Sequence, residues 1–170
     1  IVFTSFSGIG FGLLFFLGVG LPAPKGMAAL IFLLIADSLA IGGILTSTFH
    51  LGHPERALKA FSQWKTSWLS REAWLATGAI SLMTIYGFGL VFFGVAIGVV
   101  GIFGAVLSIA TVYSTSMIYG ALKTVPRWNT PLTPILFLVI SLTGGSIIAG
   151  LEEITLILLL MTGITQVVSW

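Results

Sequence analysis

The chain has 170 residues, of which 57% are hydrophobic and 7% are charged, and its mean hydropathy is +1.14. The net charge of +2 does not support nucleic-acid binding, and the absence of cysteine excludes disulfides, thiolate metal sites and iron–sulfur ligation by this chain. Apolar runs of about 18 residues or more recur, and each can cross about 30 Å of hydrocarbon as a helix. The composition predicts an all-α, polytopic transmembrane helical bundle.

The apolar runs divide into six expected spans. The first, at about 1–20, is rich in glycine, which favours close packing of helices in lipid, and it ends at a Pro/Gly turn in residues 22–26. Residues 73–122 carry no charge over a length that fits two spans, with a break near residues 93–94. Within a single transmembrane domain of residues 1–170, the spans lie at about 1–20, 27–50, 73–92, 96–120, 133–151 and 154–170.

Two polar segments, at residues 51–71 and 121–132, connect these spans. Alternation places both on the membrane side that holds the N-terminus, here called face A. The opposite side, face B, holds the turns, including one expected at Glu152–Glu153. Face A collects six of the seven basic side chains: Arg56, Lys59, Lys65, Arg71, Lys123 and Arg127. The positive-inside rule then favours a cytoplasmic face A, while the same cations also suit the docking of a protein partner. Residues 55–64, just after Pro54, fit a short helix lying on the membrane surface.

The segment from His50 to Glu72 holds both histidines and six of the twelve charged side chains. His50 ends the second span, where a neutral imidazole could hydrogen-bond a quinone oxygen or accept a proton, or simply cap the helix. His53 lies three residues on, but too few further ligands exist to complete a metal shell. Two histidines this close together cannot bind opposite faces of a haem. We therefore expect neither metal nor haem in this chain.

Glu72 opens the third expected span. It is either an acid that stabilises a helix N-terminus, with Ser70 as a possible cap, or a carboxylate partner that orients His50 or accepts its proton. Asp37 lies in the middle of the second span, where a lone acid is costly unless it is protonated or partnered. It fits a proton path or a neutral packing residue equally well.

Aromatic side chains gather near face A: Trp64, Trp68, Trp74 and Trp128. An interfacial aromatic belt explains them without any further function, and walls for the headgroup of a lipid-like ligand are the second interpretation. Tyr119 and Arg127, beside the second polar segment, allow the same two interpretations.

Three strings carry a family resemblance: HLGHPERA from His50, SWLSRE ending at Glu72, and TVPRWNTPLTP from Thr124. They resemble the membrane anchor subunit of dimethyl sulfoxide reductase, the DmsC-type family. In that family a His-Leu-Gly-x-Pro-x-Arg-Ala segment ends the second helix and a Leu-Ser-x-Glu segment opens the third. A Thr-Val-Pro-x-Trp segment joins the fourth and fifth helices. The match covers the chain from the second to the fifth span.

The resemblance implies a multi-pass protein of the prokaryotic cytoplasmic (inner) membrane that works in anaerobic respiration. Such anchors carry no haem, oxidise menaquinol and pass electrons to a four-cluster iron–sulfur subunit, which serves a catalytic molybdopterin subunit. The resemblance places His50 and Glu72 in quinol oxidation and adds Arg56 to the quinol site, with Tyr119 as a further candidate. The chain would then be the quinol-oxidising subunit of an oxidoreductase complex, whatever its activity in isolation.

Several alternatives stay open at this stage. The chain could be a purely structural anchor whose polar loops only bind a partner, or a transporter subunit, for which Asp37 is thin support. Family members usually have eight helices, so we expect the six seen here to be part of a longer protein or of a shorter branch. Family models often place the docking face outside the cytoplasm, against the charge pattern. Neither the terminal substrate nor the direction of electron flow follows from the residues.

Overall fold

The computed structural model describes residues 2–49 and 61–169, and within these ranges it contains helices and no strands. The described helices are α1 (Val2–Gly18), α2 (Gly26–Phe49), α3 (Trp68–Phe88), the π-helical turn η2 (Gly89–Phe93), α4 (Gly98–Gly120), α5 (Leu132–Ala149) and α6 (Glu152–Val168). The predicted all-α helical bundle is confirmed.

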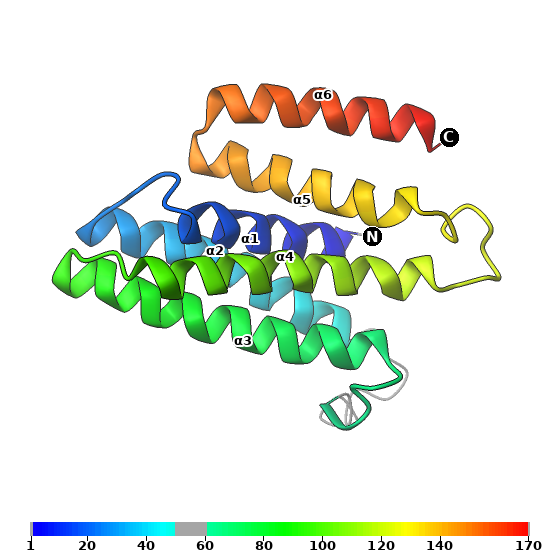
Figure 1. The fold of residues 1–170 in the computed structure, drawn as a ribbon, viewed down its shortest axis with the longest axis horizontal. Coiled ribbons are helices and arrows are strands. Elements are labelled where there is room, and N and C mark those ends of the chain that lie inside the picture. Colours follow the sequence, from blue (N-terminus) through cyan, green and yellow to red (C-terminus); the bar gives the residue numbers. More distant parts are fainter. Residues whose placement is uncertain (1, 50–60, 170) are drawn as a thin grey trace.

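The helices lie side by side with their axes roughly parallel (Figure 1). α1 packs against α2, α4 and α5, while α3 packs mainly against α4 and α6 packs against α5. The start of α1, the segment before α3, the connector between α4 and α5 and the end of α6 lie at the same end of the bundle. This end is face A, and the remaining turns lie at face B.

Four of the described helical segments are long and apolar enough to cross a membrane: Gly26–Thr46, Trp68–Phe93, Gly98–Gly120 and Leu132–Ala149. α1 and α6 have 17 residues each, so each spans only about 25 Å at the helical rise. That length lies at the lower limit for a transmembrane helix, about 17 residues. The chain is a multi-pass membrane protein.

Small and hydroxyl side chains make up much of the bundle interior beside large apolar side chains of α1 such as Phe11 and Leu14, and many other large apolar side chains cover the outside. α4 shows the pattern clearly, because Gly104, Ser108 and Thr111 are buried while Ile102 and Phe103 are exposed. A soluble protein would reverse this arrangement. In lipid, where burying an apolar side chain gains little, helices associate through close backbone contact and interhelical hydrogen bonds.

Glycines on α1 allow the closest of these backbone contacts. A Cβ atom added at Gly12 would overlap the carbonyl oxygen of Ser141 on α5, and one added at Gly145 would overlap the backbone of Gly12. On the neighbouring face of α1, a Cβ atom at Gly10 would overlap the backbone nitrogen of Ala40 on α2. The glycine-rich composition of the first span therefore serves packing against two helices at once.

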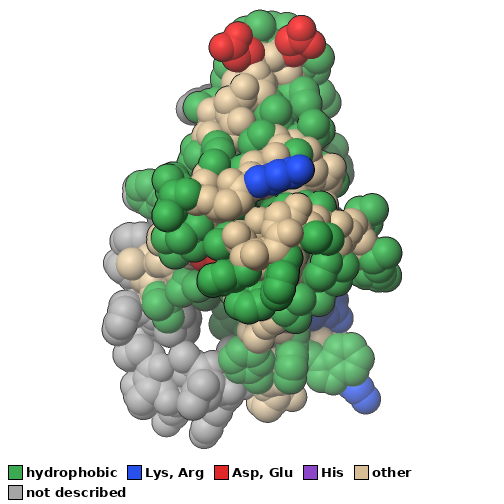
Figure 2. Space-filling model, turned by 90° about the vertical axis from the view of Figure 1, so that its left-hand side faces the viewer, with side chains coloured by type: hydrophobic (Ala, Val, Ile, Leu, Met, Phe, Trp, Pro, Cys, Tyr) green, Lys and Arg blue, Asp and Glu red, His purple; other side chains and the backbone are tan. Residues whose placement is uncertain are grey.

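The turns at face B depend on glycines with positive φ. Gly94 follows η2 with φ of 64°, and Gly150 ends α5 with φ of 71°, a region that only glycine enters without strain. Glu152 and Glu153 lie in the first turn of α6, so the expectation that they form the turn itself is wrong. Gly150 makes the turn, and the acids stabilise the helix N-terminus. Figure 2 looks onto face B, which is largely hydrophobic, with acidic side chains at the edge where α6 lies.

Candidate functional site

The start of α3 differs from the sequence-based expectation. The helix begins at Trp68, and the Ser67 side chain caps it by accepting a hydrogen bond from the backbone nitrogen of Ser70 at 3.4 Å. Ser70 is therefore not the cap; it is buried, and its hydroxyl accepts a hydrogen bond from the backbone nitrogen of Gln63 at 3.2 Å. Because Glu72 lies beyond the first turn, where the helix-dipole effect fades, stabilisation of the helix N-terminus does not explain this carboxylate.

Glu72 is held by the neighbouring helix instead. The Thr115 hydroxyl of α4 donates a hydrogen bond of 2.5 Å to the Glu72 carboxylate, and the Thr115 oxygen also lies 3.0 Å from the Thr111 carbonyl oxygen. Glu72 is partly buried and lies roughly 6 Å along α3 from its start, at the helical rise. The α3–α4 interface thus presents a carboxylate about one turn inside face A.

An aromatic hollow of about 640 Å³ lies between the segment before α3 and the outer sides of α3 and α4. Trp68 contacts Tyr113 edge-to-face at 6.1 Å, and Trp74 donates a hydrogen bond from Nε1 to the Phe61 carbonyl at 3.0 Å. Three of the four predicted belt tryptophans line this hollow: Trp64, Trp68 and Trp74.

Arg71 fastens the segment before α3 to the helix. Its Nε donates to the Trp64 carbonyl at 3.1 Å, its Nη2 donates to the Lys65 carbonyl at 2.8 Å, and its guanidinium lies 4.3 Å from the centre of the Trp68 ring. From the sequence alone this residue is one of six cations on face A. In the structure it holds part of the 51–71 segment in one conformation.

Arg71→Gln is therefore expected to loosen residues 63–67 without unfolding the bundle. The backbone nitrogens of Thr66 and Ser67, which donate to the Gln63 carbonyl, should exchange hydrogen about tenfold faster, the usual effect of losing charged hydrogen bonds. Hydrogen-exchange mass spectrometry measures this rate. Lys65→Gln removes the same charge but keeps its carbonyl, and it should leave the exchange unchanged; equal acceleration in both variants would contradict the role of Arg71.

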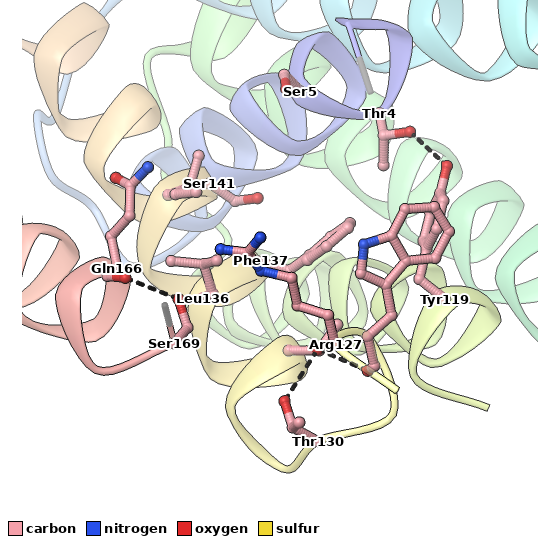
Figure 3. Close-up of a pocket in the computed structure, with 13 residues that line it drawn as sticks. Thr4, Ser5, Tyr119, Arg127, Thr130, Leu136, Phe137, Ser141, Gln166 and Ser169 are labelled. Carbon is pink, nitrogen blue, oxygen red and sulfur yellow. Dashed lines mark hydrogen bonds between the residues drawn. The ribbon is translucent and has the colours of Figure 1, made fainter. Parts of the chain in front are cut away.

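A second pocket, of about 380 Å³, opens at face A between α1, α4, α5 and the end of α6 (Figure 3). The Tyr119 hydroxyl lies 3.0 Å from the Thr4 hydroxyl on α1, and the Tyr119 ring contacts Trp128 edge-to-face at 5.4 Å and Phe137 at 5.5 Å. Arg127 reaches into the pocket from the connector between α4 and α5. Trp128, the fourth belt tryptophan, lines this pocket and not the aromatic hollow.

The structure separates some of the predicted site residues. Glu72 lies in the α3–α4 interface, whereas Tyr119 faces α1 and α5 one turn further along α4 than Thr115. His50 and Arg56 lie outside the described residues, as do His53 and most of the expected surface helix at 55–64. Asp37 is partly exposed on α2, and its buried Oδ1 has no hydrogen-bond partner in the described part of the chain.

Sequence reasoning missed Thr115 and Thr4 as partners of the candidate site residues. A signal was present on α4, because Thr111, Thr115 and Tyr119 recur every four residues along one side of an uncharged helix. Within residues 2–49 and 61–169, no group of three histidine, aspartate or glutamate side chains lies together to hold a metal ion.

Comparison with known proteins places this helical bundle in a family. The chain matches, over residues 1–169, the family described as DMSO reductase anchor subunit (DmsC). The chain belongs to the DmsC family. The family is one of membrane anchors in molybdoenzyme complexes, and the six described helices with polar connectors at one end suit such an anchor.

A curated relative supports the same assignment. The DmsC-family chain is 36% identical over 143 residues to a sulfite dehydrogenase subunit of Allochromatium vinosum. The aligned part makes up 76% of this chain and 44% of the relative, so the chain spans less than half the length of that protein. No solved structure matches the chain.

Proposed function

We propose that this chain is the haem-less, quinol-oxidising membrane anchor of a respiratory molybdoenzyme complex. Quinol binds at the face A ends of α2, α3 and α4, and its electrons pass to an iron–sulfur subunit docked over the two polar segments. That subunit serves a catalytic molybdopterin subunit. The complex lies in the cytoplasmic membrane, with the basic face A on the cytoplasmic side.

The observation that carries this proposal is the Glu72 carboxylate between α3 and α4. A carboxylate in a largely apolar helix interface is costly, and here one hydroxyl, from Thr115, holds it in a fixed position. A purely structural anchor does not need this group. A quinol-oxidising subunit needs a positioned proton acceptor close to the membrane surface, because the reaction releases protons to water.

Two side chains of this chain and one docked subunit account for the protons and electrons of quinol oxidation. Oxidation of the quinol to the quinone releases two protons and two electrons. His50 hydrogen-bonds one quinol hydroxyl and accepts its proton, Glu72 accepts the second proton, and both protons pass to water at face A. The electrons leave singly to a cluster of the docked subunit, so no redox centre is required within this chain. Menaquinol is the quinol that the family resemblance suggests.

The polar segments of face A form the docking surface for the iron–sulfur subunit. Arg71 fixes residues 63–67, and the connector at 121–131 is closed onto the end of α4 by the Asn129 side chain, which donates to the Gly120 carbonyl at 2.6 Å. Residues 63–67 and 121–131, held in this way, bind a partner without a large cost of ordering.

His50→Ala in the assembled complex tests the function. It is expected to lower quinol-driven reduction of the partner about tenfold, the usual effect of losing one hydrogen bond to a reacting group, and to weaken binding of a quinone analogue. Electron transfer is measured both from quinol to the partner and from the partner to quinone. A reductase takes electrons from quinol, whereas a dehydrogenase delivers electrons to quinone. His53→Ala is the matched control. Unchanged turnover and unchanged analogue binding in His50→Ala would identify a purely structural anchor instead.

A further inference from the structure

The 380 Å³ pocket between α1, α4, α5 and α6 has no task in quinol oxidation at Glu72. We propose that it binds the phosphate group of an anionic phospholipid, with the acyl chains lying against α5. Arg127 is the residue that recognises the phosphate. The proposal does not depend on the quinol site, and either can fail without the other.

One end of the pocket suits an anion. Arg127 extends from the connector toward the polar side chains of Ser141 on α5 and Gln166 on α6 (Figure 3). Ser5 of α1 and Ser169 add further hydroxyl groups, and none of the described residues that line the pocket is acidic. A guanidinium beside several neutral donors matches a phosphate, whose oxygens accept several hydrogen bonds at once.

The other part of the pocket is apolar. Leu136, Phe137 and Ile140 of α5 line it, and Ile140 is 37% exposed on the surface that meets lipid. Arg127, Gln166 and Ser169 lie near face A, and the apolar wall of α5 continues from there toward the membrane interior, where Ser141 adds one hydroxyl group. A phospholipid likewise has a charged phosphate followed by hydrocarbon chains. The volume of the cavity lies within the usual range for ligand pockets, about 300–1,000 Å³.

Hydrogen bonds to α4 and α5 hold the connector backbone next to Arg127 before any ligand arrives. The Thr133 hydroxyl donates to the Trp128 carbonyl at 2.7 Å, and Asn129 ties the same segment to the end of α4. Trp128 in turn packs against Tyr119. The backbone that follows Arg127 is therefore held at Trp128 and Asn129, which reduces the entropy lost on binding.

A phosphate explains these features better than a quinone ring does. A quinone is neutral and gains little from a guanidinium placed among neutral donors, whereas a phosphate forms charge-assisted hydrogen bonds with it. The Tyr119 and Thr4 hydroxyls, which could serve a quinone oxygen, are hydrogen-bonded to each other. The location also fits, since basic pockets between transmembrane helices near the membrane surface are a usual form of headgroup site.

The test is a lipid titration of the full-length protein in neutral detergent, read by native mass spectrometry. The probes are phosphatidylglycerol, zwitterionic phosphatidylcholine, inorganic phosphate and a quinone analogue. Arg127→Gln is compared with Lys123→Gln, which removes the same charge from the same connector but does not line the pocket. Ile140→Trp narrows the apolar end without changing any charge, and thermal unfolding confirms that each variant is folded.

Arg127→Gln should weaken phosphatidylglycerol binding at least about tenfold, as loss of a charge-assisted pair implies. Lys123→Gln should weaken it by less than about fivefold, the effect of general surface attraction. Ile140→Trp should weaken it as well, and phosphatidylcholine should bind more weakly than phosphatidylglycerol. Equal losses in the two charge variants would overturn the proposal. So would inorganic phosphate binding as tightly as the lipid, or Arg127-dependent binding of the quinone analogue in place of the lipid.

Discussion

Glu72→Gln is expected to lower the rate of quinol-driven electron transfer in the assembled complex by about 100-fold, the lower end of what a general base contributes. The amide has the shape of the carboxylate, and its oxygen can still accept the hydrogen bond that Thr115 now donates to Glu72. The α3–α4 interface should therefore keep its structure while losing the proposed proton acceptor. Stopped-flow reduction of the clusters of the proposed iron–sulfur partner by a soluble quinol measures the rate.

Thr115→Val is the control for this variant. It removes the hydroxyl that holds Glu72 but keeps the carboxylate, so the rate should fall by less than about tenfold, the value of one hydrogen bond. Complex assembly, followed by co-purification of the partner subunits, should be normal in both variants. A wild-type rate in Glu72→Gln would remove this residue from the mechanism, and the carboxylate would then serve only the helix interface.

Gly12→Val is expected to prevent normal packing of α1 against α5. A Cβ atom at this position would overlap the Ser141 carbonyl oxygen, and a backbone atom in a helix cannot move aside as a flexible side chain can. Overpacking typically costs about 1–3 kcal/mol, and contact with backbone on a central helix places this variant at the upper end of that range. Thermal unfolding of the purified protein in detergent measures the loss.

Gly163→Val provides the matched comparison. Gly163 lies on exposed α6, where an added Cβ atom would meet nothing within 4 Å, so its stability should change by no more than about 0.5 kcal/mol. Similar destabilisation of the two variants would mean that helix propensity, and not contact between α1 and α5, controls stability at Gly12.

Much of the architecture could be predicted from the order of residues. The thickness of the hydrocarbon layer dictates the length of each apolar run, and polar connectors must alternate between the two membrane faces. The uncharged stretch from Ala73 to Leu122 therefore had to turn once, and it turns at Gly94. Details at helix ends are harder to predict, because Ser67 and Ser70 are both plausible caps and only the path of the preceding chain decides between them.

The arrangement of the candidate site depends on contacts between distant residues. Glu72 can be recognised as a candidate from its string, but its partner Thr115 is 43 residues away on another helix. From the sequence, Tyr119 and Glu72 are both expected near face A and are therefore predicted to belong to the same site. The rotation of α4 directs Tyr119 toward α1 and α5 instead, into a pocket formed by four helices.

The sequence by itself determined that this chain crosses a membrane as helices, that its charge gathers on one face, and that its motifs belong to an anchor family. The first two properties depend on local hydrophobicity and charge, which set where each segment lies relative to lipid and water, and the third depends on three short residue strings. Only the tertiary structure decided that Thr115 holds Glu72, that Arg71 binds the carbonyl groups of the segment before α3, and that Arg127 lines a separate pocket. In a bundle packed through glycine, serine and threonine, small side chains allow many rotations of each helix, and close backbone contacts select one of them.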